Sequence, residues 1–349
     1  MKPKGGWLTV NKKCNLRCKW CYAKGTDYLQ NNNMSFKLAK KLTLLMKDTG
    51  IKQVIIIGGE PTLWKPLFEY NDFCREIGIT TVLVTNGVRF GSSKFYKEYL
   101  KHPSDIIGVS LKAGTSKQLY QVAQSKAFYK IQKGLYRISK LESTIGITYN
   151  TFYRNNLIDL SMLAKKCGFD IFKIDFCSTT FENGKPSSKY MVHPKQIVED
   201  IYRDYWELNK IMDGGIVLEI SIPFCIFPKE FINLLIKRKQ VISVCHVIKR
   251  DGIIFDYNGN VIMCNGLHDY PIGKYEKDFN DSIELINFLN STEIQKYYKQ
   301  ISHYPSSKCK ECNFYNMCGG GCPLKWAVYK PSETLGDAYE SLKNQLVSV

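Results

Sequence analysis

Short runs of β-branched residues alternate with longer segments of mixed polarity through the first half of the chain. This alternation is typical of strand–helix–strand units whose parallel strands form one sheet. A helix is predicted over 36–46, where apolar residues recur at helical spacing after Ser35, a residue type that caps helix N-termini. The pattern therefore predicts an α/β fold with six strands: Trp7–Val10, Gln53–Ile57, Thr80–Thr85, Ile106–Leu111, Thr144–Tyr149 and Ile171–Phe176.

The second half of the chain has a different pattern. A turn-rich stretch at 182–188 follows Phe181, and a helix is expected near His193 and Pro194. Residues from Phe181 to about Gly215 are therefore interpreted as a bridge. Farther along, residues 252–264 predict two strands that an Asn-Gly turn joins into a hairpin.

The strongest chemical signal follows the first predicted strand. Cys14, Cys18 and Cys21 stand at x3 and x2 spacing in the run Cys-Asn-Leu-Arg-Cys-Lys-Trp-Cys. Thiolates are the ligands that select iron–sulfur clusters or zinc. Three of them suit an iron–sulfur cube with one unligated iron, where a small molecule can chelate, better than a tetrahedral zinc. A zinc knot or three buried thiols are the alternatives.

Together with Gly58-Gly59-Glu60-Pro61 after the apolar run 54–57, this motif resembles the radical S-adenosylmethionine (radical SAM) superfamily over roughly the first 200 residues. The resemblance implies an open, partial (β/α)6 TIM-type barrel. It also implies a 4Fe-4S cluster on the three cysteines, whose open iron binds the amino and carboxylate groups of S-adenosylmethionine. One electron would then cleave this cosubstrate to methionine and a 5′-deoxyadenosyl radical.

Residues at the strand ends of such a barrel are expected to contact the cosubstrate. Trp20 matches the family's aromatic position near adenine, and Ser110 lies where relatives contact the ribose hydroxyls and the methionyl carboxylate. Many relatives carry Asp where this chain has Lys112, which could pair with the carboxylate instead. Local packing of Trp20 and a plain strand-end hydroxyl at Ser110 are the simpler interpretations. The full set of expected cofactor-binding residues is Trp20, Gly58, Gly59, Glu60, Thr85, Asn86, Ser110 and Lys112.

A second group of cysteines lies in the last third of the chain. Thirteen residues separate Cys245 from Gly259, and four more separate this glycine from Cys264; the run then continues with Cys309, Cys312, Cys318 and Cys322 at x2, x5 and x3 spacing. This spacing resembles the SPASM extension of radical SAM enzymes, which holds two auxiliary 4Fe-4S clusters. The resemblance implies one cluster on Cys245, Cys264 and Cys322 and another on Cys309, Cys312 and Cys318.

The resemblance does not assign a fourth ligand to either auxiliary cluster. The family's seventh cysteine is absent after Cys322, so Asp337 or Glu340 could complete the second cluster, or that iron stays open. Cys225 lies where some relatives supply a fourth thiolate to the first cluster. A catalytic role for Cys225 as a hydrogen-atom donor, or an inert buried thiol, are the other interpretations. Zinc is the alternative metal for the pairs between Cys309 and Cys322.

The remaining cysteines, Cys74, Cys167 and Cys177, are expected to be small buried hydrophobes, although Cys177 could face the barrel mouth. Thirteen cysteines without a signal peptide or a spanning segment favour metal ligation in a reducing cytoplasm. The length of 349 residues predicts two domains, here a radical SAM core at 1–205 and a SPASM domain at 241–349, with a bridging region at 206–240.

The formal charge of +17 would attract an acidic partner. The basic residues are scattered and no nucleic-acid-binding motif is found, so neither nucleic acid nor a membrane is expected as a partner. An acidic peptide, or an acidic, low-potential electron donor such as a flavodoxin or ferredoxin, would be attracted by the same positive charge.

SPASM-containing enzymes mostly modify peptides or proteins, so the resemblance predicts maturation of a ribosomally made peptide through a thioether or carbon–carbon crosslink, another oxidation, or epimerisation. Because the chain starts almost at its first strand, leader recognition is expected from a separate protein or from the basic surface. One alternative is a sulfatase-maturing formylglycine synthase, which is disfavoured because Asn265 stands where such relatives have Asp. A small-molecule dehydrogenase and a non-catalytic iron–sulfur electron carrier are the others.

Overall fold

The computed structural model describes residues 3–25, 32–182, 184–243, 245–301, 309, 311–331 and 334. Within these ranges most strands join one eleven-stranded sheet, in the order β10-β9-β6-β5-β4-β3-β2-β1-β11-β12-β13. Neighbouring strands run parallel from β10 to β11, and β12 and β13 continue the sheet antiparallel. The strands are β1 (Gly5–Thr9), β2 (Gln53–Ile57), β3 (Thr80–Thr85), β4 (Ile106–Ser110), β5 (Ser143–Tyr149), β6 (Phe172–Phe176), β9 (Ile216–Glu219), β10 (Val241–Ile242), β11 (Gly252–Phe255), β12 (Asn260–Ile262) and β13 (Gly273–Lys274), with β7 (Thr180–Glu182) and β8 (Lys185–Ser187) as a separate hairpin.

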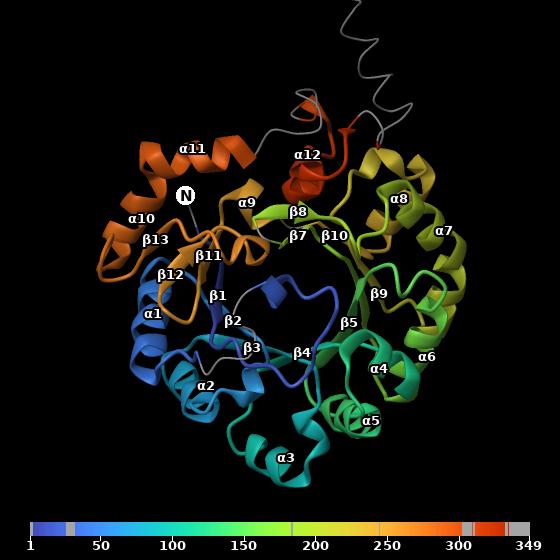
Figure 1. The fold of residues 1–349 in the computed structure, drawn as a ribbon, viewed down its shortest axis with the longest axis horizontal. Helices are drawn as coiled ribbons and strands as arrows, with labels where there is room; N and C mark the ends of the chain where they lie inside the picture. The colour runs from blue at the N-terminus through green and yellow to red at the C-terminus, as the bar shows by residue number, and fades with distance from the viewer. Residues whose placement is uncertain are drawn as a thin grey trace, which may run out of the picture.

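The parallel strands curve into an incomplete ring with helices α1 to α8 outside it, as Figure 1 shows. The dark blue loop that follows β1 lies inside this ring. The helices are α1 (Phe36–Asp48), α2 (Leu67–Glu76), α3 (Ser93–Tyr99), α4 (Ser116–Ala123), α5 (Phe128–Ile138), α6 (Leu157–Lys166), α7 (Pro194–Ile211), α8 (Lys229–Lys237), α9 (His246–Lys249), α10 (Ser282–Asn290), α11 (Thr292–Ile301) and α12 (Tyr315–Cys318).

Burial explains why these segments fold as they do. Helix α1 begins after Ser35, whose side chain accepts a hydrogen bond from the Leu38 N–H at 3.1 Å, and its apolar face is buried. Side chains alternate between buried and partly buried along β2, so that Val54 and Ile56 are fully covered. In the described part of the chain, no helix is both long and apolar enough to cross a membrane.

The α/β barrel-type fold predicted from the sequence is confirmed. The six predicted strands are β1 to β6, and their ends differ from the prediction by no more than two residues. The expected hairpin is formed by β11 and β12, with Gly259 at a φ of 78° in the turn, a backbone conformation that glycine adopts without steric cost. Helix α7 begins after His193, where a helix was predicted.

The sheet is longer than the six-strand prediction. Strands β9 and β10 extend one edge and β11 extends the other, so the sheet runs past both expected domain boundaries. The boundary after residue 205 falls inside α7, and the boundary after residue 240 falls directly before β10. The three-part division of the chain stays a prediction.

Candidate functional site

A cavity of about 510 Å³ lies where the parallel strands end and their loops begin. All eight residues that were predicted to bind the cosubstrate line it, together with Cys14, Cys18 and Cys21. The carboxyl ends of parallel strands share one edge of a sheet, which is why motifs far apart in sequence meet here. The structure thus brings the predicted set together, while the contact that each residue would make with a cofactor stays a prediction.

Two glycines let the loop after β2 approach the loop that carries the cysteines. A Cβ on Gly58 would lie 2.4 Å from Asn11 Oδ1, and one on Gly59 would lie 2.4 Å from the carbonyl oxygens of Lys12 and Lys13. The Gly59 N–H donates to the Asn11 carbonyl at 2.8 Å. Only glycine fits at this approach, so the glycines position the cysteine loop against the strand end.

The Glu60 side chain is buried and ties the loops after β2 and β3 together. Its Oε1 accepts hydrogen bonds from the Thr62 N–H at 3.2 Å and from the hydroxyls of Thr62 and Thr85, each at 2.6 Å. Its Oε2 accepts one from the Asn86 N–H at 2.8 Å. The carboxylate predicted to contact the cosubstrate is therefore also a structural link between two strand ends.

Two of the N-terminal thiols, those of Cys14 and Cys18, lie in surroundings that disfavour their charged form. Burial raises the pKa of Cys14 to about 12, and Glu60 adds to this shift. Burial also raises the pKa of Cys18, against the opposing charge of Lys112. Such thiols stay protonated until a cation displaces the proton, and three thiols around one cavity are a donor set that fits an iron–sulfur cluster.

Lys112 lies between three of the predicted groups. Its Nζ is 2.5 Å from Ser110 Oγ and 6.0 Å from the centre of the Trp20 ring. Trp20 is buried and packs edge-on against Tyr153, with ring centroids 5.3 Å apart. Trp20 therefore both packs locally and lines the cavity, and Lys112 supplies a cation in its wall.

The same cavity also holds an acidic pair that was not predicted from the sequence. Asp175 on β6 and Glu219 on β9 are register partners in neighbouring parallel strands, and both line the cavity. Burial and then the neighbouring Glu219 carboxylate raise the pKa of Asp175, against the opposing charge of Lys325, to about 7. The available signal was an acidic residue within each of two mostly apolar runs.

Lys325 is buried in the 3₁₀ turn η7 (Pro323–Ala327) that directly follows Cys322. Its Nζ donates to the carbonyl of Cys177 at 2.6 Å and so links the C-terminal segment to the end of β6. Cys177 is buried and lines the cavity, as the option of a place at the barrel mouth predicted. Cys74 and Cys167 are buried, in agreement with their expected role as small hydrophobes.

Cys245, Cys264 and Cys322 line the same cavity as the N-terminal cysteines. Burial raises the pKa of Cys264 to about 12, with Cys322 and then Cys245 adding to it. Next to Cys264, the Oδ1 of Asn265 is buried and has no hydrogen-bond partner among the described residues. This amide oxygen is therefore available to a ligand in the cavity.

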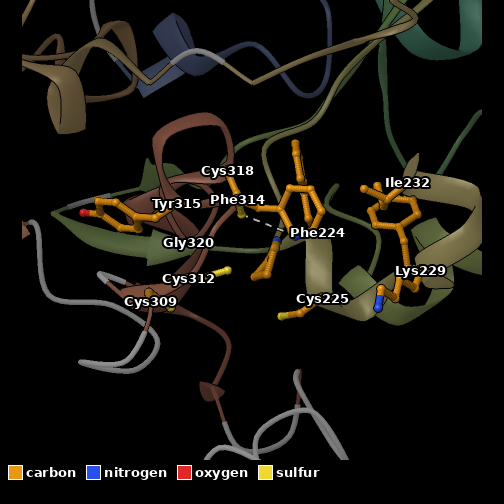
Figure 2. Close-up of a pocket in the computed structure, with 12 residues that line it drawn as sticks. Phe224, Cys225, Lys229, Ile232, Cys309, Cys312, Phe314, Tyr315, Cys318 and Gly320 are labelled. Carbon is orange, nitrogen blue, oxygen red and sulfur yellow. Dashed lines mark hydrogen bonds between the residues drawn. The ribbon is translucent and has the colours of Figure 1, made fainter. Parts of the chain in front are cut away.

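A second cavity of about 300 Å³ is lined by Cys225, Cys309, Cys312 and Cys318, of which Cys318 also lines the first cavity. Figure 2 shows Cys309, Cys312 and Cys318 on one side of it and Cys225 on the other. Cys225 thus lies with this set, whereas the sequence had suggested it as an option for the set of Cys245, Cys264 and Cys322. Among the described residues, no three His, Cys, Asp or Glu side chains come close enough to share one metal ion. Asp337 and Glu340, the other options considered for this cluster, lie outside the described residues.

Comparison with known proteins agrees with this geometry. Residues 8–167 match the family model of the Radical SAM superfamily. A cysteine-type anaerobic sulfatase-maturating enzyme from Clostridium novyi is 25% identical over 344 residues, which cover 90% of this chain and 86% of that protein.

Two solved structures share the fold. Native anSMEcpe with bound AdoMet has a TM-score of 0.68 at 16% identity, covering 99% of this chain and 100% of that one. SuiB of Streptococcus suis bound to the precursor peptide SuiA has a TM-score of 0.69 at 17% identity, covering 94% and 74%. Radical SAM proteins use a 4Fe-4S cluster and S-adenosylmethionine, the ligands that the N-terminal cysteines and the cavity fit. Residues 8–167 of this chain are therefore a radical SAM domain.

Proposed function

We propose that this radical SAM enzyme modifies a ribosomally made peptide, through a thioether or carbon–carbon crosslink, another oxidation, or epimerisation. The observation that carries the proposal is that Cys14, Cys18 and Cys21 share one cavity with Cys245, Cys264 and Cys322. Its volume of about 510 Å³ is in the range that holds small organic ligands. A cosubstrate and one reacting side chain would occupy this cavity, and the rest of a peptide would lie outside.

The chain's own residues would hold the reactants. When bound, the cluster and S-adenosylmethionine supply a 5′-deoxyadenosyl radical, which can take hydrogen from an unactivated carbon. The Lys112 ammonium would pair with the carboxylate of the cosubstrate, and Trp20 would form the wall beside its adenine. Placing one C–H bond and excluding water is then the task of the cavity walls.

Polar groups on the wall near Cys264 support a peptide as the substrate. The buried Asn265 Oδ1 has no partner among the described residues and would accept a hydrogen bond from a peptide N–H. Asp175 and Glu219 would meet other polar groups of the substrate. The solved complex of SuiB with its precursor peptide, which shares the fold, is consistent with such an occupant.

The proposed reaction also needs an electron donor and a means of recognising the peptide's leader. A low-potential donor such as a flavodoxin or ferredoxin would supply the electron in the cytoplasm, and the net charge of +17 favours an acidic one. The peptide's leader would be recognised by a separate protein or by the basic surface of this chain.

A second candidate function is maturation of a sulfatase. Similarity to the Clostridium novyi sulfatase-maturating enzyme over 90% of the chain favours it. Asn265 cannot accept a proton, but Asp175 lies in the same cavity and burial raises its pKa to about 7, a value suited to a base near neutral pH. In this candidate Asp175 would be the base that Asn265 cannot supply.

One experiment separates them. The reconstituted full chain is incubated without oxygen with dithionite and S-adenosylmethionine, and with either a precursor peptide encoded beside its gene or a cysteine-containing sulfatase peptide. Mass spectrometry should show loss of two hydrogens from the precursor for a crosslink, or deuterium uptake in heavy water for epimerisation. Formylglycine in the sulfatase peptide would favour the second candidate.

An Asn265→Asp variant is the matched control for substrate choice. It should not form formylglycine in the sulfatase peptide, because substrate placement also limits the reaction. If 5′-deoxyadenosine forms while both peptides stay unchanged and a small molecule is consumed, the peptide proposal is wrong.

A further inference from the structure

Cys309, Cys312 and Cys318 offer three thiols, one fewer than a fully ligated 4Fe-4S cluster uses. We infer that Cys225, from a segment far upstream in the sequence, is the fourth ligand and that these four cysteines bind a 4Fe-4S cluster. The inference goes beyond the proposed function, because the ligand set does not depend on which molecule the enzyme modifies.

The segment that carries Cys225 is fixed against the C-terminal cysteines. Cys225 lies in the 3₁₀ turn η4 (Phe224–Ile226), and the Phe224 N–H donates to Cys318 Sγ at 3.3 Å. A second contact joins the same two segments, because the Cys322 N–H donates to the Ser221 carbonyl at 2.9 Å. The Phe224 and Phe314 rings pack with centroids 6.3 Å apart. These contacts hold η4 beside α12.

A run of three glycines shapes the backbone around the Cys318 sulfur. Gly319, Gly320 and Gly321 have φ values of 58°, 75° and 83°, in the region that favours glycine. The Phe224 N–H donates to this sulfur at 3.3 Å, and the Gly321 N–H donates to the Cys318 carbonyl at 3.0 Å. Hydrogen bonds to the cysteine sulfurs are among the features that tune an iron–sulfur cluster.

The cavity itself suits a cluster better than a single ion. It measures about 300 Å³, and Figure 2 shows the sulfur atoms of Cys225 and Cys312 facing each other across it. A tetrahedral zinc would need all four sulfurs within about 2.3 Å of one point. Aromatic and aliphatic side chains form the rest of the wall, and Lys229 is the charged residue among the described lining residues. Such an apolar, cationic surrounding suits the anionic thiolates of a cluster.

The test compares iron content and spectra in the full chain. Wild-type protein, Cys225→Ala, Cys225→Ser and Cys309→Ala are purified and reconstituted without oxygen. Iron and sulfide analysis of Cys225→Ala should show a loss of about four irons, or of one iron with a 3Fe-4S signal in electron paramagnetic resonance, relative to wild type. Cys309→Ala should lose the same signal. Cys225→Ser should keep the cluster with an altered signal, because a serine oxygen can replace the sulfur.

Far-UV circular dichroism and the iron that remains on the other cysteines show whether each variant folds. The double variant Asp337→Ala, Glu340→Ala is the matched control for the tail and should keep the full iron content. A wild-type iron count and spectrum in Cys225→Ala would overturn the inference. Loss of the cluster in the tail variant, or zinc instead of iron at this site in wild-type protein, would overturn it as well.

Discussion

Replacing Glu60 by Ala tests how the loops around the radical SAM site are held. The Glu60 carboxylate accepts hydrogen bonds from two backbone N–H groups, those of Thr62 and Asn86, and from the hydroxyls of Thr62 and Thr85. Without the carboxylate the hydroxyls can turn to other acceptors, but the two buried N–H groups cannot. At about 1–3 kcal/mol for each buried unpaired group, the unfolding free energy should fall by about 2–6 kcal/mol.

Glu60→Gln should also destabilise the protein, because its amide NH₂ would place a donor against one of these donors. Urea unfolding of wild type, Glu60→Ala and Glu60→Gln, followed by circular dichroism, measures the change in unfolding free energy. Glu76→Ala is the matched control, since Glu76 is exposed at the end of α2 and its loss should cost less than about 0.5 kcal/mol. If Glu60→Ala unfolds within about 1 kcal/mol of Glu76→Ala, the carboxylate does not hold these loops.

Two further predictions concern the same cavity. Gly59→Ala should lower the rate of 5′-deoxyadenosine formation by about tenfold or more, because its Cβ would lie 2.4 Å from two carbonyl oxygens of the cysteine loop. The control is Gly108→Ala, whose Cβ would meet Val84 at 3.7 Å and which should leave this rate nearly unchanged. Equal rates in the two variants would contradict this reasoning. Asp175 has a pKa of about 7 when folded and an ordinary value of 3.8, so folding binds a proton between these values and stability falls as pH rises through them. The melting temperature of Asp175→Asn relative to wild type should therefore rise from about pH 4 to about pH 8, and a constant difference would refute the shifted pKa.

The fold could be predicted because buried parallel strands have a recognisable sequence pattern, namely short β-branched runs between helical segments. Strands β1 to β6 have that form. Strand β9 escaped prediction because it is only four residues long and follows a long helix, so its place in the sheet depends on pairing with β6. The acidic pair of Asp175 and Glu219 was missed for the same reason, since their meeting depends on strand register.

The sequence predicted which residues form the candidate site, but it did not predict most of the contacts between them. The cysteine spacing and the glycines could be recognised in the sequence, because each motif lies within one short loop. The links of Glu60 to Thr85 and Asn86 depend on how β2 pairs with β3, which no local pattern specifies. The position of Cys225 beside Cys318 likewise depends on contacts between segments far apart in the chain, since Phe224 hydrogen-bonds Cys318 and the residues just before it pack against Gly321.

The central claim is that Cys14, Cys18 and Cys21 hold the cluster that cleaves S-adenosylmethionine. The most direct measurement is 5′-deoxyadenosine formation by the anaerobic, reconstituted chain with dithionite, in wild-type protein and in the variant with all three cysteines replaced by Ala. Wild type should form 5′-deoxyadenosine, and the variant should form none while keeping iron on its C-terminal cysteines. Cleavage retained by the variant, or absent from fully reconstituted wild type, would contradict the claim.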